Sequence, residues 1–183
     1  MTEAVAKDGV SVVIAAIVMS LYLIVFLGSF SPIHCRLVVA LAGILSVILS
    51  FFSGFGLLYY FGHETSDFHA WLPFLMMAIG SEHMFVLCNA VDRTDLEHSA
   101  YIRIHEALSY AGPEITITSL TTCCAFLFGM LSSLEALRSF CLFATVSVLM
   151  LYLSNMTFFL AVIVWDTRRV HDLQRECFGA FTC

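Results

Sequence analysis

Residues 37–61 read LVVALAGILSVILSFFSGFGLLYYF, a long apolar run without a single charged side chain. A helix needs about 20 apolar residues to cross the hydrocarbon core of a bilayer, which is about 30 Å thick. The run is continuous rather than alternating, and unpaired backbone groups are too costly in lipid, so it predicts a helix rather than a strand. We therefore expect this stretch to span a membrane.

The composition of the whole chain agrees with this expectation. Of its 183 residues 60% are hydrophobic and 12% are charged, and the mean hydropathy is +0.93. Soluble domains carry about 45–50% apolar and about 25% charged residues. The 8 basic residues are outnumbered by 14 acidic ones, and no basic stripe could meet a phosphate backbone. The composition predicts an integral membrane protein and excludes a soluble enzyme, a nucleic-acid binder and a disordered tail.

Five apolar runs predict an all-α bundle of five transmembrane helices. The predicted spans are residues 10–30, 37–61, 71–91, 113–134 and 137–165. Between the third and fourth spans, Thr94 and Glu97 form a T-x-x-E capping box. Apolar residues at helical spacing then predict an amphipathic linker helix over residues 95–111, lying on the membrane surface. Gly112 and Pro113 are expected to end this helix.

The distribution of Lys and Arg predicts the orientation, because cytoplasmic loops carry an excess of them. One side of the membrane holds Arg36, Arg93, Arg103, Arg168, Arg169 and Arg175. The other side holds Lys7 and Arg138. The linker helix and the C-terminal tail (166–183) are therefore expected in the cytosol, and the N-terminal tail (1–9) outside. An outside N-terminus without a signal peptide is awkward for a stand-alone protein, so we expect an upstream helix to be missing from this chain.

The third span carries two titratable residues near its middle, Glu82 and His83. A charge at the bilayer centre costs about 2.5–3.5 kcal/mol even on lenient insertion scales, so intramembrane ionisable residues are often functional. Two such groups at one depth predict a proton relay. Asn89 lies seven residues after Glu82 and is expected on the same face of the helix. The alternatives are a neutral, hydrogen-bonded structural carboxyl for Glu82 and a packing imidazole for His83.

The fourth span offers hydroxyl groups that could support this pair. They are Thr118, Ser119, Thr121 and Thr122, in a stripe that begins at Glu114. Each could instead bond back to its own helix carbonyls, as Ser and Thr often do. We name Thr118, Ser119 and Thr122, with Asn89, as supporting polar residues.

Other chemistry is not expected. No nucleophile–base set, cofactor motif or metal-ligand spacing is found, so no enzyme, cofactor or metal is predicted. His63 and His69 share a loop with acids and suggest a solvated turn, and the sequon at Asn155 lies inside an apolar run, out of reach of glycosylation. Gly43, Gly54 and Gly56 favour close helix approach over space for a sterol ring.

Several motifs resemble those of Patched, Dispatched and the Niemann–Pick type C transporter. Leu72-Pro73-Phe74-Leu75 followed by Gly80-Ser81-Glu82-His83 resembles the fourth helix of that family, which runs Pro-Phe-Leu and then Gly-x-Asp-Asp. The stretch from Gly112-Pro113-Glu114 to Thr121 resembles the fifth helix, and Asp166-Thr167-Arg168-Arg169 the end of the sixth. Tyr22, in Leu21-Tyr22-Leu23-Ile24, lies where sterol-sensing domains carry Tyr-Ile-Ser.

The resemblance implies a sterol-sensing domain of five helices, related to resistance–nodulation–division transporters. It implies a sterol or another lipid as ligand, Tyr22 as a sterol-response residue, and cation coupling through Glu82 and His83 in place of the acidic pair. Because Asp-Asp is replaced by Glu-His, proton transfer is favoured over Na⁺. The family's first helix, outer domain and second half are absent, so the partner expected is the missing half or another copy.

Three functions remain open after this comparison. The first is the membrane domain of a proton-coupled sterol or lipid transporter or receptor, in the plasma membrane rather than endosomes. The second is a sterol sensor or scaffold that does not transport. The third is an inactive truncated fragment.

Overall fold

The computed structural model describes residues 14, 17, 18, 20–22, 25, 37–63, 67–94 and 99–169. Within these ranges the chain forms helices and no strand. Four helices are long and apolar enough to cross a membrane: Val38–Tyr60, His69–Asp92, Ala100–Gly129 and Glu135–Arg169. The predicted all-α membrane bundle is thus confirmed, while most of the first predicted span, 10–30, lies outside the described residues.

The second and third predicted spans form separate helices near their expected bounds. Helix α2 covers Leu37–Tyr60, and α3 covers Leu72–Asp92 after a short 3₁₀ turn, η1, over Asp67–Trp71. Pro73 lies in the first turn of α3, where its missing N–H costs no hydrogen bond. Gly62 follows α2 with a φ of 79°, a left-handed conformation that suits glycine.

The linker helix and the fourth span were predicted as two elements, and this prediction is wrong. Helix α4 runs without interruption over Ala100–Gly129 and contains Pro113 in its interior. A proline removes one backbone hydrogen bond, which membrane helices tolerate where neighbouring groups compensate. Nearby hydroxyls bond to other carbonyls of the same helix: Ser109 donates to the Glu106 carbonyl and Thr116 to that of Gly112, both at 2.7 Å.

The predicted capping box falls partly outside the described residues, because Glu97 is not among them. Helix α4 begins after Ser99, and the Thr94 hydroxyl instead donates to the Val91 carbonyl at 2.7 Å. Thr94 Oγ1 also accepts a bond from Nε of the buried Arg103 at 3.0 Å. This pair ties the end of α3 to the start of α4.

The final helical segment is longer than its predicted span and contains one wide turn. Helix α5 covers Glu135–Ser154 and is followed by a π-helical turn, η2, over Asn155–Phe159. The helix then continues to Arg169. Its last turn is held by Asp166, which is 3.0 Å from Arg169 and buried. The segment assigned to a tail from residue 166 therefore begins inside this helix.

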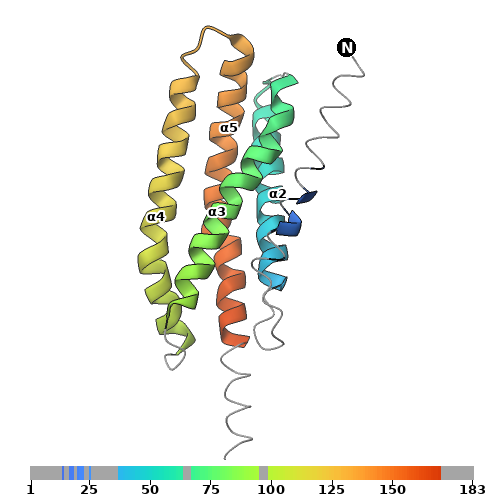
Figure 1. Ribbon diagram of the computed structural model, residues 1–183. Helices are drawn as coiled ribbons and strands as arrows, with labels where there is room; N and C mark the ends of the chain where they lie inside the picture. The colour runs from blue at the N-terminus through green and yellow to red at the C-terminus, as the bar shows by residue number, and fades with distance from the viewer. Residues whose placement is uncertain are drawn as a thin grey trace, which may run out of the picture.

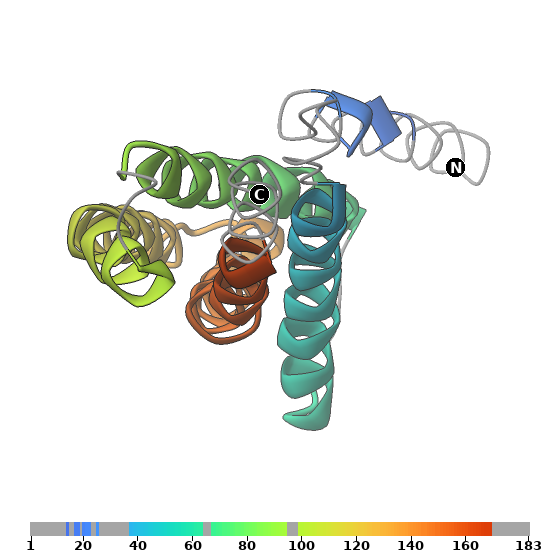
Figure 2. The same cartoon turned by 90° about the horizontal axis from the view of Figure 1, so that it is seen from below.

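The helices run alternately up and down and pack around α5 (Figure 1). Seen along the bundle, α5 lies between α4 and α2, and α3 crosses over them (Figure 2). The core between them holds the fully buried Met76, Met84, Val148, Leu151 and Phe159. This arrangement brings the middle of α3 against α4, α2 and the η2 turn.

Two of the three glycines of α2 serve close helix approach, as predicted. A Cβ at Gly43 would collide with the Met84 side chain of α3. A Cβ at Gly54 would lie 2.6 Å from Ser147 Oγ of α5. Gly56 has no neighbour within 4 Å of such an atom. The first two glycines thus let α2 approach its neighbours.

Candidate functional site

His83 lies where the helices of the bundle meet. Its side chain is 1% exposed, although it stands in the middle of a membrane-length helix. The two ring nitrogens each have a polar partner from a different helix. Nε2 is 3.3 Å from Ser119 Oγ of α4, and Nδ1 is 3.0 Å from Asn155 Nδ2 of η2.

The polar contacts continue from Asn155 into α2. Asn155 Oδ1 accepts a bond from the Ser46 hydroxyl at 3.1 Å, and both residues are almost fully buried. Ser46 Oγ also lies 2.7 Å from Ser154 Oγ of α5. We call His83, Ser119, Asn155, Ser46 and Ser154 the buried polar cluster. It links all four described membrane-spanning helices through side chains.

The wide turn η2 begins at Asn155, the residue that reaches His83. Single π-turns within α-helices are rare and are frequently found at functional sites. The turn also packs against α2, which carries Ser46. The local backbone is therefore unusual at the point where the cluster is assembled.

The orientation of the Asn155 amide favours one tautomer of the His83 ring. Asn155 presents its N–H to Nδ1, so Nδ1 acts as an acceptor and is unprotonated. Nε2 then carries the proton and donates a hydrogen bond to the Ser119 hydroxyl. This assignment follows from the orientation of the Asn155 amide, whereas the Ser46 hydroxyl can donate or accept and is compatible with either orientation.

Glu82 does not share the buried environment of His83. Its side chain is exposed, as is that of Asn89. Adjacent helical residues project about 100° apart, so the burial of His83 turns Glu82 outward. Phe85 on α3 contacts the Tyr22 ring, with centroids 6.1 Å apart. Tyr22, the predicted sterol-response residue, thus lies against α3.

The predicted supporting residues on α4 have different surroundings. Ser119 contacts His83 directly. The hydroxyls of Thr121 and Thr122 donate to the Thr118 carbonyl of their own helix, at 2.9 and 2.8 Å. The alternative of back-bonding is therefore realised for these two. Whether Thr118 or Thr122 supports a relay stays a prediction.

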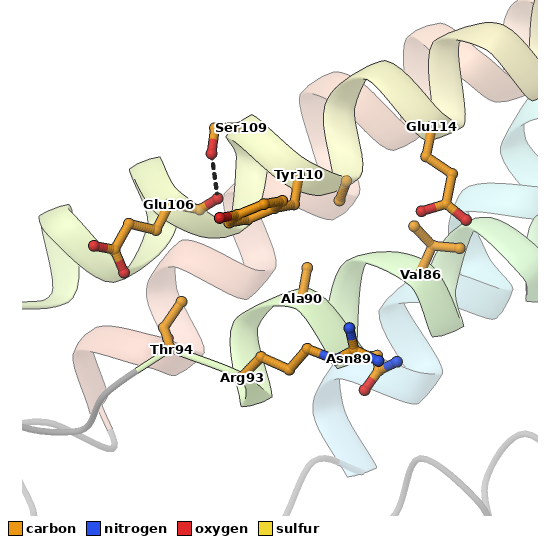
Figure 3. A pocket seen from close by; sticks show the side chains of 10 residues that line it. Val86, Asn89, Ala90, Arg93, Thr94, Glu106, Ser109, Tyr110 and Glu114 are labelled. Atoms are coloured by element: carbon orange, nitrogen blue, oxygen red, sulfur yellow. Dashed lines mark hydrogen bonds between the residues drawn. The ribbon is translucent and has the colours of Figure 1, made fainter.

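Asn89 lines a groove between α3 and α4, together with Glu114 (Figure 3). The groove has a volume of about 900 Å³. Figure 3 shows Glu114 reaching from α4 toward Val86 on α3. Its lining combines apolar and polar side chains: Val86, Asn89, Ala90, Arg93, Thr94, Glu106, Ser109, Tyr110, Ala111 and Glu114.

Sequence reasoning missed Asn155, Ser46 and Ser154. Asn155 was judged only as a glycosylation site and not as a buried amide. An amide inside an apolar run is costly unless it is hydrogen-bonded, and this was the available signal. The serines carried less information, because a serine in a helix usually bonds back to its own backbone.

His69 was predicted in a solvated turn, and this prediction is wrong. It is 5% exposed and its ring lies 4.5 Å from that of Phe143, centroid to centroid, in an edge-on contact. Phe55 also packs against it, with centroids 6.2 Å apart. His69 therefore anchors η1 to the bundle. Across the described ranges, no group of three or more His, Cys, Asp or Glu could hold a metal ion.

Comparison with protein families agrees with the motifs and the helical bundle. Residues 32–183 match the profile described as "Sterol-sensing domain of SREBP cleavage-activation". The chain belongs to the sterol-sensing domain family. The sterol-sensing domain that the resemblance to Patched and Niemann–Pick type C proteins implied is thereby confirmed, and the four membrane-length helices among the described residues make it a multi-pass membrane protein.

Relatives of this sterol-sensing domain include proteins named after Niemann–Pick type C and proteins named after Patched. A "Niemann-Pick type C1-related protein" of Toxoplasma gondii is 34% identical over 134 residues, 73% of this chain and 11% of the relative. The "NPC intracellular cholesterol transporter 1 homolog 1b" of Drosophila melanogaster is 28% identical over 172 residues, 88% of this chain and 14% of the relative. Human "Protein patched homolog 2" is 32% identical over 145 residues, 79% of this chain and 12% of that protein. The chain thus spans a small fraction of each relative.

Proposed function

We propose that this sterol-sensing domain binds a sterol or another lipid in the membrane of a Patched-like transporter or receptor, and that His83 couples this binding to a proton gradient. The observation that carries the proposal is the burial of His83 within the helix bundle, with a polar partner from α4 for one ring nitrogen and from η2 for the other. An intramembrane ionisable residue with specific partners is by default a functional candidate. Plasma membrane is favoured over endosomes by the Patched-like motifs.

The lipid part of the proposal is supported by the family and by the groove between α3 and α4. The groove places Val86, Ala90 and Ala111 beside Asn89 and Ser109. Such a mixed lining suits an amphiphile with an apolar body and one polar group, as a sterol has. Tyr22, against Phe85, is retained as a sterol-response candidate.

Glu82 takes a different role from the one first expected. A carboxylate facing lipid is costly, and Glu82 is exposed on α3. We propose that another membrane segment covers this face, either the second half of a larger transporter or a second copy. Glu82 would then contribute to the proton path from the far side of α3. The orientation with the arginine-rich end of the bundle in the cytosol belongs to the same proposal.

Photolabelling tests the lipid and proton parts together. The chain is placed in phospholipid nanodiscs with a photoreactive sterol and unlabelled cholesterol as competitor. We expect competed labelling that changes with pH by about 5- to 150-fold, the usual range for coupled sites. His83→Asn and Glu82→Gln should keep the labelling and lose its pH dependence, and Ser147→Ala should behave as the wild type.

The outcomes separate the candidate functions. Labelling that is equal at all pH values in the wild type contradicts proton coupling and favours a sensor or scaffold that does not transport. Labelling that cholesterol does not compete contradicts sterol binding. Ser147 is a suitable control because it is a fully buried serine on α5 whose hydroxyl has no hydrogen-bond partner among the described residues.

A further inference from the structure

The side-chain amide of Asn155 stands between two partners of different chemistry. Its Nδ2 faces His83 Nδ1 at 3.0 Å, and its Oδ1 accepts from Ser46 at 3.1 Å. A carboxamide has two donors on one side and an acceptor on the other. Rotation of the amide by about 180° would exchange the group that each partner meets.

Protonation of His83 would conflict with the observed amide orientation. A proton on Nδ1 turns this nitrogen into a donor, and it would then face the N–H of Asn155. Asn155 is 1% exposed, and a buried donor left without an acceptor is unfavourable, more so when a charge is involved. The protonated ring therefore requires an acceptor where the amide nitrogen now lies.

We propose that Asn155 is a positioning residue whose amide reverses when His83 Nδ1 gains a proton, and that the reversal is passed to α2 through Ser46. The inference rests on the proposed function, in which His83 carries the proton. After rotation Oδ1 accepts from Nδ1–H, and Nδ2 donates to Ser46 Oγ. Nε2–H continues to donate to Ser119.

The serines on the other side of the amide can accommodate this reversal. Ser46 Oγ and Ser154 Oγ are 2.7 Å apart and either can donate. With Nδ2 donating to Ser46 Oγ, the Ser46 hydroxyl donates to Ser154. The Ser154 hydroxyl has an acceptor in the Ser46 carbonyl, at 3.5 Å. Every group of the buried polar cluster thus keeps a partner in both states.

The charged surroundings of His83 do not supply another acceptor. Helix α2 contains no charged residue or histidine. On α4 the charged residue nearest Ser119 in sequence is the exposed Glu114, and on α3 Glu82 points outward. The other titratable groups on the packed elements include Cys88 of α3, Tyr59 and Tyr60 of α2, Cys123 and Cys124 of α4, and Cys141 and Tyr152 of α5, with Tyr22 against Phe85. The Asn155 oxygen is therefore the acceptor that the contacts place within reach of Nδ1.

The test is nitrogen NMR of the chain in nanodiscs, with ¹⁵N-labelled histidine and asparagine. At neutral pH we expect His83 to carry its proton on Nε2. On acidification the Nδ1 signal should become protonated, and the Asn155 NH₂ signals should move with the same midpoint. Asn155→Asp, which offers only acceptors, should hold a proton on Nδ1 at neutral pH. Asn155→Leu should abolish the preference for Nε2, and Ser147→Ala should leave the spectra unchanged.

Three results would overturn the inference. If His83 titrates while the Asn155 signals stay fixed, the amide does not reverse, although His83 can still carry a proton. If Nδ1 is already protonated at neutral pH, the observed orientation is not the neutral state. If His83 does not titrate while the bundle remains folded by circular dichroism, the proton role in the proposed function fails as well.

Discussion

Gly54 shows at the scale of one residue how closely two helices of this bundle approach. An added Cβ would lie 2.6 Å from Ser147 Oγ and 2.9 Å from the Ser147 Cα. Because part of the obstruction is backbone, it cannot be relieved by a side-chain rotation. Gly54→Ala should therefore lower the free energy of unfolding by about 1–3 kcal/mol, as overpacking does. Thermal unfolding in detergent is the measurement, with about 2–4 °C lost per kcal/mol.

Gly56 provides the matched control on the same helix. An added Cβ there meets nothing within 4 Å, and alanine is favoured over glycine in a helix by about 1 kcal/mol. Gly56→Ala should be neutral or stabilising. Equal destabilisation by both variants would contradict the close contact between α2 and α5.

The same scale shows what sequence reasoning could and could not find. An intramembrane histidine is visible in the sequence, and so is its angular separation from Glu82. Which of the two faces the core depends on where α4 and η2 lie, and this the sequence does not state. Asn155 was equally visible, but its role depends on a contact between residues 72 positions apart.

At the scale of elements, α4 carries the next prediction. In the continuous helix, amides just after Pro113 bond to carbonyls of the preceding turn. If a new helix began at Pro113, its first four N–H groups would lack such partners. Hydrogen exchange measured by mass spectrometry should therefore be slow over residues 114–117 in nanodiscs. Exchange as fast there as in the turn at residues 131–134 would instead support two separate helices.

The continuity of α4 also explains a limit of pattern reading. Gly-Pro is a common end of a soluble helix, because proline lacks a donor and restricts the residue before it. In a membrane the alternative to helix is unpaired backbone in lipid, which is more costly. Helix α4 has 30 residues and is therefore about 45 Å long at 1.5 Å per residue. It is long enough to contain both predicted elements.

At the scale of the whole molecule, the alternating helices place Arg93, Arg103, Arg168 and Arg169 at one end of the bundle and Arg138 at the other. The positive-inside rule then predicts a cytosolic C-terminal end and an outer turn between α4 and α5. A glycosylation acceptor on a flexible loop inserted after Ser133 should be modified in cells, and the same loop added after Cys183 should not. The reverse pattern would invert the orientation.

The architecture could be predicted to this extent because it follows from the properties of lipid as a solvent. Long apolar runs must become helices, and their lengths match the bilayer. Residues 37–61 therefore predicted α2 to within one residue of its observed end, Tyr60. The packing of α3 across α2, α4 and α5 depends on side-chain fit between distant segments. Because apolar runs resemble one another, they carry little information about this packing.

The wide turn at Asn155 sets the rotational phase of everything that follows it. Buried residues recur at intervals of four, through Leu151, Asn155, Phe159, Ile163 and Thr167. In a regular α-helix such a series would drift by about 40° per step and wind away from its neighbours. The hydrogen-bonded ring of a π-turn contains one residue more than that of an α-turn, and this additional residue takes up part of the drift. A natural or engineered chain one residue shorter between positions 155 and 159 would thus close a regular α-turn there and keep Asp166 on its buried side, whereas one residue fewer elsewhere in the same helix would turn the final segment by about 100°.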